Sequence, residues 1–248
     1  MGRKYAHSPI IEVVCEVHFG ADSEWDMTVP GLVYERVKDT LPKRQQVRAF
    51  VLKLPPDSRP EFTATDRIQF CAENGQSFIQ VSPRVLAVNH LKPYPLWETY
   101  SSLIQKGFNA YCDVTRPTTI ERIGLRYINK IEFEEKTVEL EDFFNFYPFL
   151  GTGLPQDYAH FNVEILALFA NGRDILKTKL TSISSEPSTE DKSSILLDLD
   201  YFLGKPGTIP PDGVLAWVNE AHQQVEEAFE ACIKDSLRAK FSEEEAEQ

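Results

Sequence analysis

The chain lacks an excess of basic residues. Its 26 Lys and Arg stand against 38 Asp and Glu, which gives a formal net charge of −12. Proteins that bind duplex nucleic acid usually carry a basic excess, because their cations displace counterions from the phosphate backbone. The composition therefore argues against duplex nucleic acid as a partner. It favours a protein partner with a basic surface, since complementary charge speeds encounter.

Long apolar segments and closely spaced cysteines are also absent. No apolar run approaches the roughly 20 residues that a helix needs to cross a bilayer, and Met1 to His7 is polar and basic, unlike a secretory signal. The four cysteines never stand at metal-ligand spacing: Cys15, Cys71, Cys112 and Cys232. We expect a cytoplasmic protein with no membrane contact, no bound metal and no cofactor.

None of the common catalytic motifs occurs in the sequence. Gly-x-x-x-x-Gly-Lys-Ser/Thr, Gly-x-Gly-x-x-Gly and Gly-x-Ser-x-Gly are all missing, which disfavours the usual phosphate-binding loops and nucleophile elbows. No His-x-x-x-His or His-Glu-x-x-His spacing appears, and Cys112 has no histidine close in sequence. The sequence therefore predicts no catalytic residues and favours a function without catalysis.

The first half of the chain shows clear strand and helix patterns. After Pro9, Val13, Cys15 and Val17 recur with period two on one face, which is typical of a strand. Asn74-Gly75 is a strong signal for a tight hairpin turn. The predicted elements are strands at 10–19, 47–54, 61–72, 77–82 and 85–90, and helices at 30–41 and 97–111.

The second half repeats these patterns. Ile123, Leu125 and Tyr127 alternate with polar residues along a strand, and Asn171-Gly172 predicts a second hairpin. The predicted elements are strands at 119–131, 161–170, 174–183 and 195–203, and helices at 140–147 and 213–241. The glutamate-rich tail, residues 242–248, is expected to fray.

Residues 1–116 and 117–241 thus share one order of elements, and only the strand at 47–54 has no counterpart. We predict an α+β fold with two pseudo-repeated antiparallel sheets, each with a short helix and a long packing helix, in one continuous unit. This order resembles the helix-grip and TATA-binding-protein architectures in topology. A likeness of topology implies nothing about function.

Two motifs resemble those of a sporadically distributed prokaryotic family of uncharacterised proteins of about this length. That family carries a Pro-(Pro/Ile)-x-Glu opening strand and an Arg-x-Gly-Leu-Arg-Tyr-x-Asn central strand, which correspond here to Ser8 to Glu12 and Arg122 to Asn129. The similarity extends to Trp25-Asp26, Pro30 to Leu32, Leu197 to Tyr201 and His222. The resemblance covers nearly the whole chain and supplies no chemistry. Its patchy distribution implies an accessory role, such as a bacterial defence or toxin-neutralising system.

The central strand carries a row of cations. Arg122, Arg126 and Lys130 share one face, about 13 Å apart from one to the next, and Glu12 and Glu16 repeat with the same period on the opening strand. If these strands are neighbours, cross-strand Glu–Arg ion pairs follow. The alternative is an anion-binding site, since paired guanidinium groups suit carboxylate and phosphate.

Three further polar positions need an explanation. Asn129 lies in line with apolar residues and requires a hydrogen-bond partner if it is buried. Asp198 and Asp200 share a face of the last strand and are interpreted as solvated edge carboxylates, because further oxygen ligands for a cation are not evident. His222, beside the apolar stripe of the last helix, is interpreted as a satisfied core or boundary residue.

Two hypotheses of function follow. The first is a non-enzymatic binding or accessory protein whose partner is another protein, with a homo-oligomer as a further possibility. Its candidate partner-binding residues are Glu12, Glu16, Arg122, Arg126 and Asn129. The alternative is a small-anion-binding protein or hydrolase that uses Arg122 and Arg126.

Overall fold

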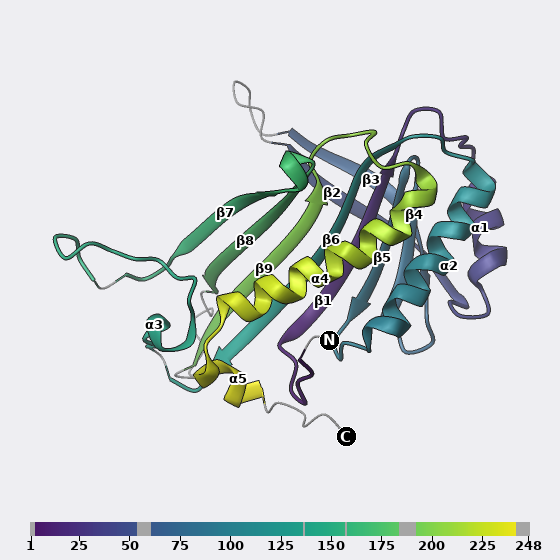
Figure 1. Cartoon of the computed structure of the whole chain (residues 1–248). Coiled ribbons are helices and arrows are strands. Elements are labelled where there is room, and N and C mark those ends of the chain that lie inside the picture. Colours follow the sequence, from purple (N-terminus) through teal and green to yellow (C-terminus); the bar gives the residue numbers. More distant parts are fainter. Residues whose placement is uncertain (1–2, 54–60, 136, 157, 184–191, 242–248) are drawn as a thin grey trace, which may run out of the picture.

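The computed structural model describes residues 3–53, 61–135, 137–156, 158–183 and 192–241. Nine strands in these ranges form one antiparallel sheet with the order β2-β3-β4-β5-β1-β6-β9-β8-β7 (Figure 1). The strands are β1 (Ile10–Phe19), β2 (Lys43–Lys53), β3 (Glu61–Cys71), β4 (Ser77–Ser82), β5 (Val85–Leu91), β6 (Ile120–Phe133), β7 (Asn162–Phe169), β8 (Asp174–Ile183) and β9 (Ser193–Leu203). The α+β class and the antiparallel pairing are confirmed.

The prediction of two sheets is wrong, because β1 and β6 pair with each other. Their antiparallel ladder places Val13 opposite Tyr127 and Val17 opposite Ile123. All four side chains are buried on the same side of the sheet. Burial of apolar surface stabilises a fold in proportion to its area, and this pairing merges what would otherwise be two separate cores.

The sheet is pseudo-symmetric about the β1–β6 pair. Outward from this centre, β5, β4 and β3 on one side correspond to β9, β8 and β7 on the other. Only β2 has no counterpart among the described residues, as the sequence predicted for its strand at 47–54. The first half of the sheet is therefore one strand wider than the second.

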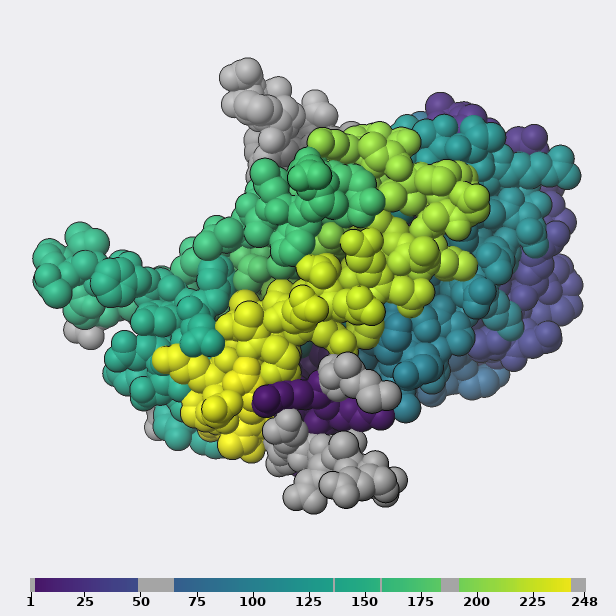
Figure 2. Space-filling view, viewed as in Figure 1, coloured from purple at the N-terminus to yellow at the C-terminus, as the bar shows by residue number. Residues whose placement is uncertain are grey.

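Three helices lie on one face of the sheet: α1 (Val29–Val37), α2 (Trp97–Thr115) and α4 (Val214–Cys232) (Figures 1 and 2). The core packs between them and the inward side chains of the strands, such as Cys15, Phe19 and Leu125. No described helix packs against the other face, which we call the open face. On β1 it carries Glu12, Val14, Glu16 and His18, all partly exposed.

The helix predicted at 213–241 is interrupted. α4 ends at Cys232, Ile233 is extended with φ −108° and ψ 157°, and α5 (Asp235–Phe241) follows. Ile233 is fully buried and forms a β-bridge with Phe144. The same bridge follows the short α3 (Leu140–Phe143), which is shorter than the predicted helix at 140–147. The predicted acidic tail, 242–248, lies outside the described residues.

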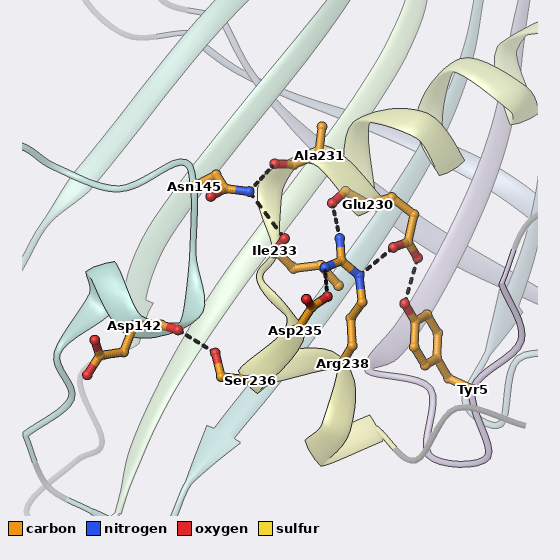
Figure 3. A network of polar contacts seen from close by, with 9 residues as sticks. All are labelled: Tyr5, Asp142, Asn145, Glu230, Ala231, Ile233, Asp235, Ser236 and Arg238. Atoms are coloured by element: carbon orange, nitrogen blue, oxygen red, sulfur yellow. Dashed lines mark hydrogen bonds and ion pairs between the residues drawn. The ribbon is translucent and has the colours of Figure 1, made fainter.

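Polar contacts fix this interruption (Figure 3). The Asn145 amide Nδ2 donates to the Ala231 carbonyl at 3.0 Å, satisfying a backbone acceptor at the end of α4. Arg238 Nε donates to the Glu230 carboxylate at 2.8 Å, and the Tyr5 hydroxyl donates to the other oxygen of Glu230 at 2.6 Å. The chain before β1 is thereby joined to α4 and α5.

Candidate functional site

The charged groups predicted from the sequence meet on the open face, at its centre. In the β6–β9 ladder, Arg126 lies opposite Asp200 and Ile128 lies opposite Asp198. In the β1–β6 ladder, Arg126 lies opposite Val14. Because side chains alternate along a strand, both arginines and both aspartates project from the same face of the sheet.

Arg126 forms a bidentate ion pair on this face. Its Nε and Nη2 each donate to one oxygen of Asp198 at 2.7 Å, a bidentate geometry. The hydrogen bonds to Asp198 raise the pKa of Arg126 above its ordinary value. Asp198 is 5% exposed, so the interpretation of a solvated edge carboxylate is wrong. β9 lies inside the sheet, between β6 and β8.

Asp200 is held more loosely by two cations. Arg122 Nη2 lies 3.5 Å and Lys177 Nζ 3.6 Å from its Oδ2. Burial raises the pKa of the Asp200 carboxyl, although the charges of Arg122, Lys177 and Arg126 act in the opposite direction. The interpretation of Asp200 as a solvated edge residue is therefore also wrong, since it is buried.

Gly124 makes room for the Arg122 guanidinium. A Cβ at Gly124 would lie 3.0 Å from Arg122 Nη1, closer than ordinary contacts. The Arg122 guanidinium carbon also lies 4.7 Å from the centre of the Phe202 ring, within the range of cation–π attraction. In the motif of β6, the absence of a side chain at Gly124 thus leaves space for the Arg122 side chain.

Glu12 and Glu16 share the open face with these arginines but pair with other residues. Glu16 accepts a hydrogen bond from Arg67 of β3 at 3.1 Å and shares another with His18 at 2.6 Å. Glu12 accepts from the Asn89 amide at 2.8 Å. No described contact joins either glutamate to Arg122 or Arg126. β1 and β6 are neighbours, contrary to the predicted separation into two sheets. The Glu–Arg pairs expected across them are nevertheless wrong, because β9 supplies the carboxylates that pair with both arginines.

Glu16 should make stability depend on pH in the acid range. Burial raises the pKa of its carboxyl, but His18 and Arg67 outweigh burial and lower the pKa from 4.5 to about 2. A lowered pKa contributes stability above pH 4.5, and this contribution is lost as the pH falls through the folded value. It amounts to about 3 kcal/mol at neutral pH.

We expect Glu16→Gln to flatten the loss of stability between pH 4.5 and about 2. Urea unfolding of wild type and variant across this range measures the effect. Glu227→Gln, at an exposed position of α4, is the control and should follow the wild-type curve. A Glu16→Gln curve as steep as that of wild type would contradict the assignment.

Asn129 lies on the other side of the sheet. It is 1% exposed on the helix-covered face, and its amide donates to the Leu197 carbonyl at 3.0 Å. The required partner is therefore present, and the residue is part of the core. Lys130 returns to the open face and pairs with Glu132 at 2.7 Å.

Beneath α4, a chain of hydrogen bonds connects Tyr94, Tyr127 and His222. The sequence indicated only part of it. The Tyr94 and Tyr127 hydroxyls lie 2.9 Å apart, and Tyr127 shares a hydrogen bond of 2.9 Å with His222 Nδ1. The His222 ring stacks on Trp97 at 3.8 Å. Burial raises the pKa of both tyrosines, so both remain protonated. The interpretation of His222 as a satisfied core or boundary residue is confirmed, since it is buried and hydrogen-bonded. Only the fold could bring Tyr94 and Trp97 to it.

The helix-covered side also carries a surface pocket of about 500 Å³. Tyr100 and Leu103 of α2 line it, together with Ser77 and His90 at the ends of β4 and β5. His90 Nδ1 is buried there without a hydrogen-bond partner among the described residues, and burial lowers the pKa of this histidine. None of the residues predicted as a site lines this pocket.

Comparisons add no relatives: no protein-family model and no curated protein matches the chain. Within the described ranges, no cluster of three or more His, Cys, Asp or Glu side chains could hold a metal ion. Nor is any described helix both long and apolar enough to span a bilayer. The case for function therefore depends on the geometry of the molecule itself.

Proposed function

We propose that the protein is a non-enzymatic binding protein that holds a protein partner on the open face of its sheet. The observation that carries the proposal is the division of the sheet into two unlike faces. Helices α1, α2 and α4 cover one face, whereas no described helix covers the other. Antiparallel sheets commonly leave one face to solvent, so the side chains on this face decide whether a partner can bind there.

The chemistry of the open face suits a protein. Apolar Val14, Ile128 and Phe202 lie among cations and carboxylates, and all three are partly exposed. Protein interfaces combine apolar contacts with arginine and a few satisfied polar groups in this way. Arg122, loosely held and stacked on Phe202, retains N–H donors for a neutral acceptor of the partner, such as a backbone carbonyl.

A small-anion site at Arg122 and Arg126 is less well supported. The Arg126 guanidinium already gives two donors to Asp198, and Arg122 and Lys177 flank Asp200. An added anion would meet two buried carboxylates at this place. Like charges close together disfavour each other's ionised form, so the site would bind the anion weakly.

The proposed function is consistent with the cytoplasmic location and the accessory role that the sequence led us to expect. All four cysteines are free thiols, which fits the reducing cytoplasm. The resemblance to a sporadically distributed family supports an accessory role, such as a defence or toxin-neutralising system. A basic partner surface remains the favoured complement to the net charge of −12.

Site-specific photo-crosslinking tests the proposal. A photoreactive apolar amino acid replaces Ile128 at the centre of the open face, or exposed Gln223 on α4 as the matched control. In the native host, we expect a discrete protein adduct from position 128, suppressed by excess unlabelled wild-type protein. Adducts from position 223 alone, or equal adducts from both, would overturn the proposal.

Calorimetric titration with inorganic phosphate separates the two hypotheses. We expect no saturable heat with the wild-type protein. Saturable binding that disappears in Arg126→Ala would support the small-anion site instead.

A further inference from the structure

The edge of the sheet at β7 lacks a strand that the pseudo-symmetry of the fold supplies elsewhere. β7 corresponds to β3, and the outer edge of β3 is covered by β2 along its whole length. Within the described ranges, β7 pairs only with β8. Its outer backbone N–H and C=O groups therefore have the geometry of an open edge, and such edges are templates for pairing with another chain.

Exposed apolar side chains are concentrated on β7 and in the loop that precedes it. Of the ten large apolar side chains exposed among the described residues, six lie between residues 149 and 168: Phe149, Leu154, Tyr158, Ile165, Leu166 and Leu168. Leu168 is 72% exposed and Leu166 is 56% exposed. Figure 1 shows β7 at the margin of the sheet, away from α4. A concentration of this kind marks an interaction surface.

The two edge strands differ in their protection against pairing. β2 carries exposed Lys43, Arg44 and Arg48, and charged side chains of this kind discourage edge-to-edge association. β7 reads Asn-Val-Glu-Ile-Leu-Ala-Leu-Phe, without proline or lysine and with Glu164 as its one charge. Of the two edge strands, only β2 carries the charged side chains that discourage pairing with another chain.

We propose that β7 pairs antiparallel with β7 of a second copy of this chain, forming a two-fold symmetric dimer with one continuous sheet. A two-fold axis perpendicular to the sheet keeps the helices of both copies on the same face. With the axis at Leu166, the two Leu166 side chains meet, and Ile165 faces Ala167 of the second copy. Glu164 then faces Leu168 of the second copy, so no like charges oppose each other despite the net charge of −12.

Pairing of β7 with β7 of a second copy is favoured over pairing of β7 with β2, because it gives an assembly with closed two-fold symmetry. Pairing β7 with β2 of another copy would join unlike edges head to tail and would close only if successive rotations completed a ring, whereas the two-fold contact closes with two copies. The self-pairing of β7 buries apolar residues against apolar residues and joins the open faces of two copies.

Sedimentation equilibrium of the wild-type protein and two lysine variants tests the dimer. Leu166→Lys alters the proposed contact, whereas Leu96→Lys alters a leucine with the same exposure, 56%, at the start of α2. We expect wild type and Leu96→Lys to be dimeric and Leu166→Lys to be monomeric with an unchanged far-ultraviolet circular dichroism spectrum. A monomeric wild type, or a Leu166→Lys variant as dimeric as wild type, would overturn the proposal.

Cysteine crosslinking reports on the register and does not depend on breaking the dimer. Under mild oxidation, Leu166→Cys should yield a disulfide-linked dimer, because directly opposed residues have Cβ atoms about 5 Å apart. Leu96→Cys is the matched control and should remain uncrosslinked. Equal crosslinking at both positions would indicate random collision and would contradict the pairing.

Discussion

Arg126→Ala is expected to lower the free energy of unfolding by about 3 kcal/mol. The substitution removes both donors from the Asp198 carboxylate, which is 5% exposed and accepts from Arg126 at 2.7 Å twice. A buried charge without its partner costs more than an exposed one, because water cannot replace the lost hydrogen bonds. The value lies at the low end of the usual range, since the Arg126 side chain is 42% exposed. Urea unfolding measures the loss.

Two further variants isolate the cause. Arg48→Ala removes another cross-strand Arg–Asp pair of the same sheet, with Arg48 Nε 3.2 Å from Asp66 and both residues exposed. That loss should be about 0–1 kcal/mol. Adding Asp198→Leu to Arg126→Ala should recover much of the stability, because the unpaired charge disappears. Equal losses of unfolding free energy in Arg126→Ala and Arg48→Ala, without recovery in the double variant, would contradict this explanation. They would show that Asp198 is not left as an unpaired buried charge.

Asp174→Ala should cost about 3–5 kcal/mol. Asp174 is 0% exposed at the start of β8. It accepts from Trp217 Nε1 at 3.0 Å, from the Tyr201 hydroxyl at 3.2 Å and from Arg173 at 2.6 Å. Alanine leaves the indole and hydroxyl donors buried without an acceptor, and it also removes the partner of the arginine.

A graded series distinguishes loss of the hydrogen bonds from loss of the charge. Trp217→Phe removes one donor and keeps most of the ring packing, so it should cost about 1–2 kcal/mol. Asp174→Asn retains an acceptor for the indole and should fall between the other two variants. Thermal and urea unfolding check the order. A loss in Asp174→Ala no larger than that in Trp217→Phe would contradict the network.

The strand and turn patterns could be predicted because they are local. Alternation along β6 and the Asn-Gly turns depend on residues next to one another in the chain. The formation of one sheet, in place of the two predicted, depends on the pairing of β1 with β6. These strands lie far apart in the sequence. The interruption of the last helix at Ile233 depends on a bridge to Phe144, which helical periodicity does not encode.

The candidate site shows the same limit. The sequence identified the charged face of β6 correctly, but β6 has two neighbours that present carboxylates to it. Glu12 and Glu16 come from β1, whereas Asp198 and Asp200 come from β9. Only the positions of both strands, with Arg67 reaching Glu16 and Asn89 reaching Glu12, decide which carboxylates pair with Arg122 and Arg126.

The central position of β1 has a consequence for synthesis of the chain on the ribosome. β1 precedes the other described strands in the chain, but it lies between β5 and β6, which are translated later. Once β5 has paired, the nascent first half exposes the other edge of β1 until β6 follows. Unpaired edges and apolar surface of this kind make incomplete chains prone to aggregation. Completion of β6 is therefore the step that covers the second edge of β1.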